Sequence, residues 1–193
     1  MEAIKSEQHF SIVDLQIEDE AAVRQVATLL MEGFAVNSPE SWPDEEASME
    51  EVRESFGKKR LSLVALDNNK NILGWIGGIS TYRGRVWELH PLVVQANAQG
   101  KGIGRALVEH LEMRVRERGG LTMFLGTDDE NHRTTLSDIN LFPNVYEHIA
   151  HLRNLKRHPY EFYQKLGYVI VGVVPDANGL GKPDILMAKS LVR

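Results

Sequence analysis

A glycine-rich turn between an apolar run and an amphipathic segment constrains the fold of this chain more than any other feature. Residues 86–94 predict a strand and residues 102–118 predict a helix, whose apolar side chains recur every fourth position. The turn between them reads Gln99-Gly100-Lys101-Gly102-Ile103-Gly104-Arg105. Glycines let the backbone approach a ligand closely, and the first N–H groups of a helix are unpaired at its positive dipole end. The turn therefore predicts a phosphate-binding site.

The spacing of the glycines narrows the class of phosphate ligand. Arg105 stands where a dinucleotide fingerprint needs its third glycine, and Gln95 stands where a P-loop needs its first. The turn instead resembles Q/R-x-x-G-x-G/A, the pyrophosphate-binding signature of the GNAT acetyltransferases, at Gln99, Gly102 and Gly104. This resemblance implies that acetyl-CoA binds along Gln99, Gly100, Lys101, Gly102, Ile103, Gly104 and Arg105. The alternative is a glycine-rich turn with a structural role alone.

The remaining pattern predicts a single mixed α/β domain over residues 1–193. Ser48 and Glu51 have capping-box spacing, so a helix is expected from Ser48 to about Phe56, after a polar loop at 37–46. Further helices are expected at 19–34, 102–118, 145–155 and 159–166, and strands at 10–15, 61–67, 72–80, 86–94, 121–126, 168–174 and 185–191. The resemblance implies the GNAT fold, a central mixed, mostly antiparallel sheet flanked by helices.

The strand at 86–94 carries the first candidate catalytic residues. Alternation puts Glu88, His90 and Leu92 on one face, and Pro91 should interrupt the pairing there, freeing backbone N–H groups. By resemblance, the acetyl thioester and pantetheine bind along Leu92, Val93 and Val94. Glu88 or His90 would accept a proton from an ammonium substrate, and the Leu92 N–H would donate to the thioester oxygen. The alternative is that Glu88 and His90 only order the strand.

A tyrosine late in the chain is the candidate general acid. The segment Phe162-Tyr163-Gln164-Lys165-Leu166-Gly167-Tyr168 resembles the F-Y-x-K-x-G-F/Y segment of GNAT proteins, which implies that Tyr163 protonates the leaving thiolate. The alternative is a half-buried tyrosine that anchors a short helix. Because the chain has no cysteine, which is the best nucleophile for an acyl-enzyme, direct transfer in a ternary complex is expected.

Longer strings resemble the enterococcal-type aminoglycoside 6'-N-acetyltransferases. They are Trp87–Val94, Leu125–Asp129, Thr134–Ser137 and His158–Gly172. The resemblance implies acetylation of the 6'-amine of aminoglycosides and a homodimer. Asn131 departs from it, since an acidic residue is expected there, and the segment before about residue 18 has no counterpart.

Aminoglycosides are polycations, so carboxylates are expected around the substrate. The candidate substrate-binding residues are Trp42, which would stack on a sugar face, and the acids Asp44, Glu45, Glu46, Asp128 and Asp129. The net charge of −5 is compatible with a cationic small molecule. The alternative is that these acids are solvated loop charges.

Composition and pattern exclude several other classes. The acidic balance argues against a nucleic-acid partner, no apolar run approaches the ~18 residues of a membrane span, and residues 1–7 carry no signal-peptide pattern, so a cytoplasmic protein is expected. Without cysteine, and with only His148 and His151 one turn apart, no metal site is expected. Two alternatives remain open: a GNAT enzyme acting on a polyamine or a protein amine, and an acetyl-CoA-binding sensor without turnover.

Overall fold

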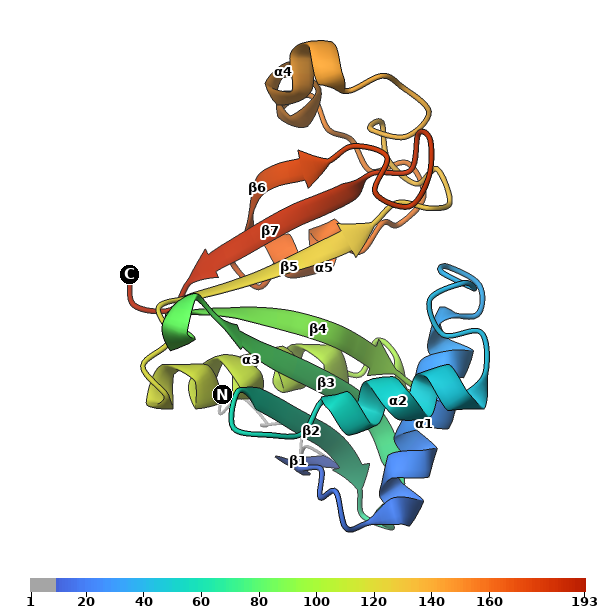
Figure 1. The fold of residues 1–193 in the computed structure, drawn as a ribbon, viewed down its shortest axis with the longest axis vertical. Helices are drawn as coiled ribbons and strands as arrows, with labels where there is room; N and C mark the ends of the chain where they lie inside the picture. Colours follow the sequence, from blue (N-terminus) through green and yellow to red (C-terminus); the bar gives the residue numbers. More distant parts are fainter. Residues whose placement is uncertain (1–9) are drawn as a thin grey trace, which may run out of the picture. The chain divides into compact units, whose positions relative to one another are not determined.

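The structure, a computed structural model, describes residues 10–193; the segment in which the sequence predicts no signal peptide lies outside these residues. Seven strands form a sheet in the order β1-β2-β3-β4-β5-β7-β6 (Figure 1). They are β1 (Phe10–Asp14), β2 (Arg60–Asp67), β3 (Ile72–Thr81), β4 (Val86–Val94), β5 (Thr122–Asp128), β6 (Val169–Val174) and β7 (Asp184–Ser190). The helices are α1 (Glu20–Phe34), α2 (Glu45–Glu54), α3 (Ile103–Glu117), α4 (Val145–Ala150) and α5 (Tyr160–Gln164). The predicted mixed, mostly antiparallel sheet with helices is confirmed.

The chain divides into two compact units. Of the described residues, unit 1 comprises 10–79 and 90–115, and unit 2 comprises 80–89 and 116–193. The chain therefore passes from unit 2 to unit 1 within β4, between Leu89 and His90.

Unit 1 has its core between α1, α2 and the antiparallel strands β1, β2 and β3. The apolar face of α1 was predicted from its period, and Val23, Val26 and Leu30 are buried as expected. This core also contains Leu15, Ala27, Leu29, Met49, Val52, Val64, Ile72, Trp75 and Val93. The indole N–H of Trp75 donates to the hydroxyl of Ser62, so its one polar atom is satisfied inside the core.

Glycines on β3 allow close packing in unit 1. A Cβ added at Gly78 would meet the Leu111 side chain of α3, and one added at Gly77 would collide with the carbonyl of His90. Larger residues at these two positions would push α3 and the second half of β4 away from β3. The absence of a Cβ at Gly77 thereby allows the His90 backbone to lie close to β3.

Unit 2 is built around β7, which pairs antiparallel with β5 on one side and with β6 on the other. The first half of β4 pairs parallel with β5, with Val86, Trp87 and Glu88 opposite Thr122, Met123 and Phe124. Leu125, Ile185 and Met187 are fully buried in this unit. The predicted helix at 145–155 is shorter than expected and ends at Ala150, because the following backbone turns to bond with Thr135 and to bridge Asn154 with Thr134.

The predicted start of α2 at Ser48 is wrong. Asp44 has extended backbone angles, and its carboxylate accepts a hydrogen bond from the N–H of Ala47, so Asp44 is the N-cap. Ser48 lies inside the helix, where its buried hydroxyl donates to the carbonyl of Asp44. Glu45 and Glu46 consequently lie in the first helical turn and not in a loop, and negative charge is favourable there.

Within residues 10–193, no helix combines the length and the apolar character that crossing a membrane requires.

The cap makes a testable difference to stability. Replacement Asp44→Ala removes the acceptor for the Ala47 N–H and should lower the free energy of unfolding by about 1 kcal/mol. The control Glu50→Ala removes an equal charge from an exposed position in the same helix and should change it far less. Urea unfolding of both variants measures the difference, and equal losses would contradict the assignment of Asp44 as the cap.

Candidate functional site

The predicted phosphate turn lies at the N-terminus of α3 in unit 1. Gly100 and Gly102 have φ angles of 75° and 85°, in the left-handed region that side chains with a Cβ rarely adopt. A Cβ at Gly102 would meet no protein atom within 4 Å, so the space in front of the backbone is open. The amide of Gln99 donates to the carbonyl of Val94 and closes the turn. The turn therefore exposes backbone and helix N–H groups to a ligand, as its sequence predicts.

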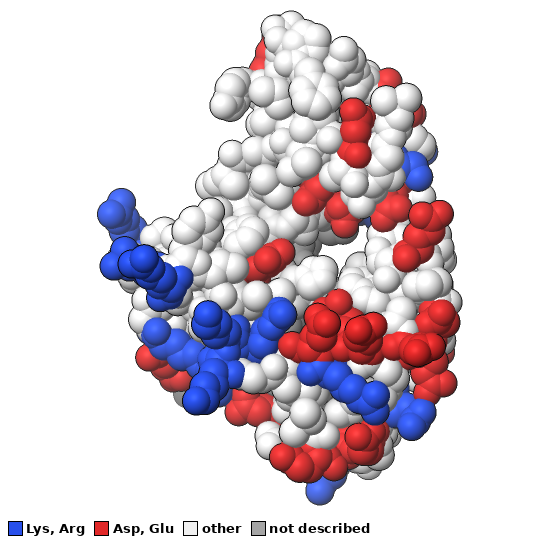
Figure 2. Space-filling model, in the orientation of Figure 1, with Lys and Arg blue, Asp and Glu red and all other residues white. Residues whose placement is uncertain are grey.

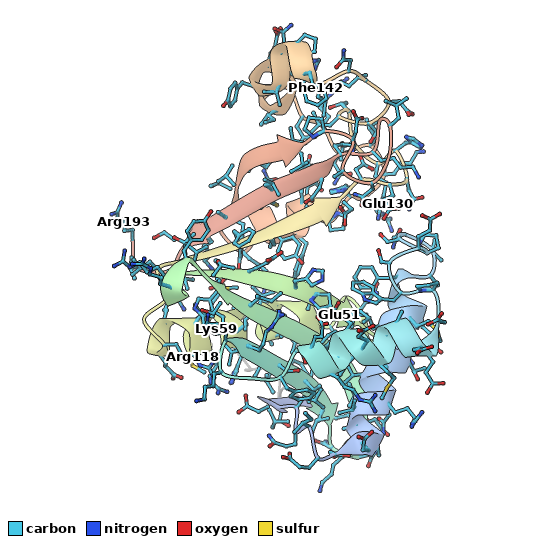
Figure 3. The ribbon with its side chains drawn as sticks, in the orientation of Figure 1. Glu51, Lys59, Arg118, Glu130, Phe142 and Arg193 are labelled. Atoms are coloured by element: carbon cyan, nitrogen blue, oxygen red, sulfur yellow. The ribbon has the colours of Figure 1, made fainter. Side chains whose placement is uncertain are left out.

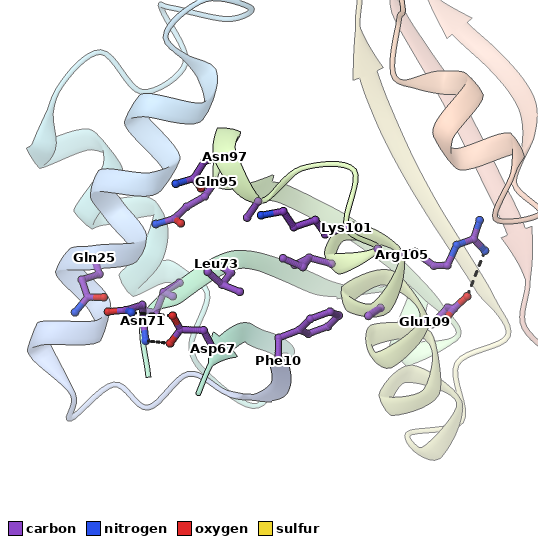
Figure 4. A pocket seen from close by; sticks show the side chains of 15 residues that line it. Phe10, Gln25, Asp67, Asn71, Leu73, Gln95, Asn97, Lys101, Arg105 and Glu109 are labelled. Atoms are coloured by element: carbon purple, nitrogen blue, oxygen red, sulfur yellow. Dashed lines mark hydrogen bonds and ion pairs between the residues drawn. The ribbon is translucent and has the colours of Figure 1, made fainter. Parts of the chain in front are cut away.

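A cavity of about 1040 Å³ opens beside this turn (Figure 4). Lys101, Gly102 and Arg105 line one side, and Phe10 and Leu73 supply apolar surface. The guanidinium of Arg105 lies 3.5 Å from the carboxylate of Glu109, one helical turn further on. Two cations beside a helix N-terminus suit a phosphate, and the apolar strand residues suit a less polar part of the same ligand.

The end of β4 leads into the turn, and its side chains alternate as predicted. Val93 is buried, and its side chain packs against Gly33 of α1, so only its backbone remains for a ligand. Leu92 and Val94 are partly exposed on the other face. The use of Leu92, Val93 and Val94 in ligand binding remains a prediction about backbone groups.

His90 lies in a small cluster in unit 1. Its ring is 5.9 Å from the ring of Trp42, which in turn meets Phe34 edge-on at 4.7 Å. On another side, Nε2 of His90 is 3.9 Å from a carboxylate oxygen of Glu51. Figure 3 labels Glu51 on α2. Two predicted site residues, His90 and Trp42, are thus brought together, and Glu51 joins them from a position that the sequence reasoning did not single out.

The acids of α2 divide between two flanks of the helix. Figure 2 shows acidic side chains gathered over α2. Glu45 forms an ion pair with Arg24 of α1 at 2.5 Å, while Glu51 points to His90. Glu46 is exposed beside Glu45 on the helix and lines the same α1-facing surface groove. Glu45 and Glu46 therefore lie on the α1 side of α2, away from the flank that carries Glu51 to His90. Their predicted role at the substrate stays a prediction.

Unit 2 gathers three carboxylates on one face of the sheet. Glu88 is opposite Phe124, and Asp128 is opposite Asp184, so the register sets Glu88, Asp128 and Asp184 on the less buried face of β4, β5 and β7. Asp128 is exposed, and its carboxylate accepts a hydrogen bond from the amide of Asn178 at 2.5 Å. This face can attract a cation.

Asp184 is the most perturbed of these acids. Burial, followed by the nearby Asp128 and Glu88 charges, raises its pKa to about 6, although a hydrogen bond from the Thr127 backbone acts in the opposite direction. Its Oδ1 is buried and has no hydrogen-bond partner among the described residues. Its carboxylate covers Gly126, where any Cβ would collide with it. A cation beside Asp184 would therefore meet a carboxylate oxygen that accepts no hydrogen bond from the described residues.

Asp129 has a different role from the one predicted, and its assignment to the substrate is corrected. The residue is fully buried and accepts hydrogen bonds from the Arg133 and Thr134 backbones and from the Ser137 hydroxyl. Burial alone would raise the pKa of Asp129, but these hydrogen bonds and His158 lower it. Asp129 therefore organises the loop after β5, and its carboxylate oxygens are used inside the protein.

Buried His158 supports the same loop. Its Nε2 contacts the carbonyl of Asp128 at 3.0 Å, and the Tyr160 N–H donates to Nδ1, which identifies a neutral ring. Burial lowers the pKa of His158 below its ordinary value, against the raising effect of the Asp128 carbonyl and Asp129. Both ring nitrogens are thus used in the structure of unit 2.

Tyr163 is buried on α5 of unit 2, with 8% of its surface exposed. Its ring meets Phe162 at 5.0 Å and Tyr168 at 5.7 Å, both edge-on. Burial raises the pKa of the Tyr163 hydroxyl, which keeps it protonated at neutral pH. The hydroxyl can therefore donate a proton, but the raised pKa makes it a weaker acid than an exposed tyrosine.

Two residues of the site were missed from the sequence. Glu51 lies seven positions after Asp44, so the two share a flank of α2, which is visible only once the helix is known to start at Asp44. Asp184 is the first residue of β7, and the predicted strand began one residue later at Ile185. A charged residue ahead of an apolar run was the available signal, but it does not distinguish a strand residue from a loop residue.

Comparison with known proteins extends this description. The sequence model of the acetyltransferase (GNAT) family matches residues 10–136. An aminoglycoside 6'-N-acetyltransferase solved with coenzyme A is 42% identical, with a TM-score of 0.86, and the enzyme of that name from Enterococcus faecium is 43% identical, with a TM-score of 0.85. A 6'-acetyltransferase of type Ii is 38% identical, with a TM-score of 0.72. Each alignment covers 95% of this chain and 98% of the other. No curated protein sequence matched the chain.

The raised pKa of Asp184 predicts a pH-dependent stability effect. The folded-state pKa of Asp184, about 6, exceeds the ordinary 3.8, so between these pH values the folded chain binds more protons than the unfolded chain. The stability that this group contributes is therefore fully present below pH 3.8 and is lost as the pH rises through 6. Asp184→Asn should therefore raise the free energy of unfolding at pH 7.5 by roughly 1–3 kcal/mol, and much less at pH 4.

Urea unfolding at the two pH values measures this effect. The control Glu147→Gln removes an exposed carboxylate of the same unit and should give the same small change at both. His158 acts in the opposite direction, since its lowered pKa costs stability as pH falls below 6.5, so the variant must be compared with wild type at each pH. A pH-independent difference for Asp184→Asn would contradict the assignment.

Proposed function

We propose that this chain, which belongs to the GNAT family of acetyltransferases and uses acetyl-CoA as its acyl donor, acetylates the 6'-amine of aminoglycosides. The observation that carries the proposal is the similarity to aminoglycoside 6'-N-acetyltransferases over 95% of this chain. Similarity confined to the coenzyme turn would support only acetyl transfer.

The coenzyme turn supports the donor half of the reaction. The pyrophosphate would bind at Gly100 to Arg105, where the helix N-terminus and the cations meet open space. The acetyl group and pantetheine would lie along the backbone of Leu92 to Val94, with the Leu92 N–H donating to the thioester oxygen.

The chemical step needs a base, a donor and an acid. The substrate ammonium loses one proton to Glu88 or His90, and the resulting amine attacks the thioester carbon. As the C–S bond breaks, Tyr163 donates its proton to the thiolate, and the second proton of the nitrogen leaves as the amide forms and restores Tyr163 through water. The F-Y-x-K-x-G-Y segment around Tyr163 supports that role. With no cysteine in the chain, transfer is direct within a ternary complex.

The carboxylates support a cationic substrate. Asp128 and Asp184, with Glu88, would attract the amines of the drug in unit 2, and Asp44, with Trp42, would do so in unit 1. Glu45 and Glu46 contribute only to the surrounding negative potential in this proposal, since they lie on the α1 side of α2.

A homodimer in the cytoplasm completes the proposal. β6 ends the strand order, and its Val169, Val171 and Val174 side chains are exposed, which supports burial of this strand by a second copy. Acetylation of an aminoglycoside there would remove a cationic amine from the drug, and resistance would follow.

Coenzyme binding tests the turn. Gly102→Val should weaken acetyl-CoA binding more than tenfold, since its side chain would fill the space open in front of the backbone. Gly119→Val is the matched control: Gly119 also has positive φ and open space, but lies beyond the end of α3. Calorimetry on the two folded variants measures the affinities, and equal weakening would overturn the placement of the coenzyme.

Substrate choice tests the reaction. Kanamycin-type drugs with a free 6'-amine should release coenzyme A thiol in the presence of acetyl-CoA, whereas drugs with a 6'-hydroxyl should not, because the hydroxyl is the poorer nucleophile and only one substituent reaches the carbonyl. The rate is read from thiol release. Rapid acetylation of spermidine or a peptide amine with no acetylation of kanamycin would move the chain to the alternative amine substrates.

A further inference from the structure

We infer that Glu51 is a positioning residue for His90: it holds the imidazole in place and balances its charge when His90 takes the proton of the substrate ammonium. This inference rests on the proposed function, and it assigns the base, which the sequence leaves open between Glu88 and His90. It starts from the 3.9 Å separation of Nε2 of His90 and Oε1 of Glu51.

The position of Glu51 is fixed by the packing of α2. Ser48 and Ser55, three residues before it and four after it, are buried on the same flank, and the Ser55 hydroxyl bonds to Val52 and Ser62. The Glu51 side chain is consequently only 24% exposed, whereas that of Glu45 on the other flank is 58% exposed. α2 therefore directs this one acid to β4.

The imidazole is limited on a second side by Trp42. The indole is held edge-on against Phe34, and its ring lies 5.9 Å from that of His90. An aromatic face also attracts a cation at this range. Glu51 and Trp42 together favour one orientation of the ring.

The geometry assigns the two ring nitrogens. Nε2 faces Glu51, so Nδ1 accepts the proton that the ammonium loses, directly or through one water. The proton remains on His90, and Glu51 stays ionised beside the imidazolium, as the aspartate does in a Ser-His-Asp triad. A separation of 3.9 Å is that of an ion pair and not of a hydrogen bond, so this role of Glu51 requires the two groups to approach further when the substrate binds.

Steady-state kinetics give the first test. Since both side chains are partly exposed, at 43% and 24%, Glu51→Gln should lower kcat about three- to tenfold, with little change in the KM for acetyl-CoA. Glu50→Gln removes the same charge from the adjacent exposed position and should leave kcat within about twofold. A change in the drug KM alone, or equal effects of the two variants, would reduce Glu51 to general attraction and overturn the inference.

A double-mutant comparison tests whether Glu51 acts through His90. In a His90→Asn background, Glu51→Gln should have almost no further effect on kcat, because the residue it positions is gone. Independent, multiplicative losses would overturn the inference.

A spectroscopic readout separates this inference from the proposed function. In protein labelled with ¹⁵N-histidine, the His90 signals, identified by their loss in His90→Asn, should show Nε2 protonated and Nδ1 unprotonated in the neutral ring. Glu51→Ala should move them towards a mixture of tautomers, and Glu50→Ala should not. Unchanged signals in Glu51→Ala would overturn the inference, whereas changed signals in a chain that acetylates no aminoglycoside would refute only the proposed substrate.

Discussion

The alternation of side chains along β4 is the constraint on which every part of the candidate site depends. Trp87, Leu89 and Val93 are buried, so the even positions are turned to the less buried face. A slip of one residue would put Glu88 and His90 into the core, where unpaired polar groups are costly. One strand thus supplies Glu88 to unit 2 and His90 to unit 1 because its odd positions are needed for packing.

Packing also decides which carboxylates remain for a ligand. Asp129 is fully buried and Asp184 is partly buried, but three groups of its own loop donate to Asp129, while Oδ1 of Asp184 has no partner among the described residues. Hydrogen bonds to the ionised form outweigh burial in the first case, and burial outweighs them in the second. The first acid is therefore part of the fold, and the second is available for a cation or a proton.

The start of α2 has an effect well beyond the helix itself. Each residue turns the helix by about 100°, so the cap at Asp44 determines which acids share a flank. Glu45 consequently meets Arg24 on α1, and Glu51 meets His90 on β4. If the helix began after Ser48, Glu45 and Glu46 would be loop residues, and the helix geometry would not keep them away from His90.

The sequence by itself determined the strands, the long helices α1 and α3, the glycine turn before α3 and the exposed face of β4, because these follow from local periodicity and from glycine spacing. It could not distinguish Asp128 from Asp129, since adjacent acids look alike until the fold exposes one and surrounds the other with donors. Nor could it connect Glu51 with His90 or Asp184 with Glu88, which lie far apart along the chain. Only the tertiary structure decided these pairings, because burial and the field of a neighbouring charge depend on distance in space and not on position in the sequence.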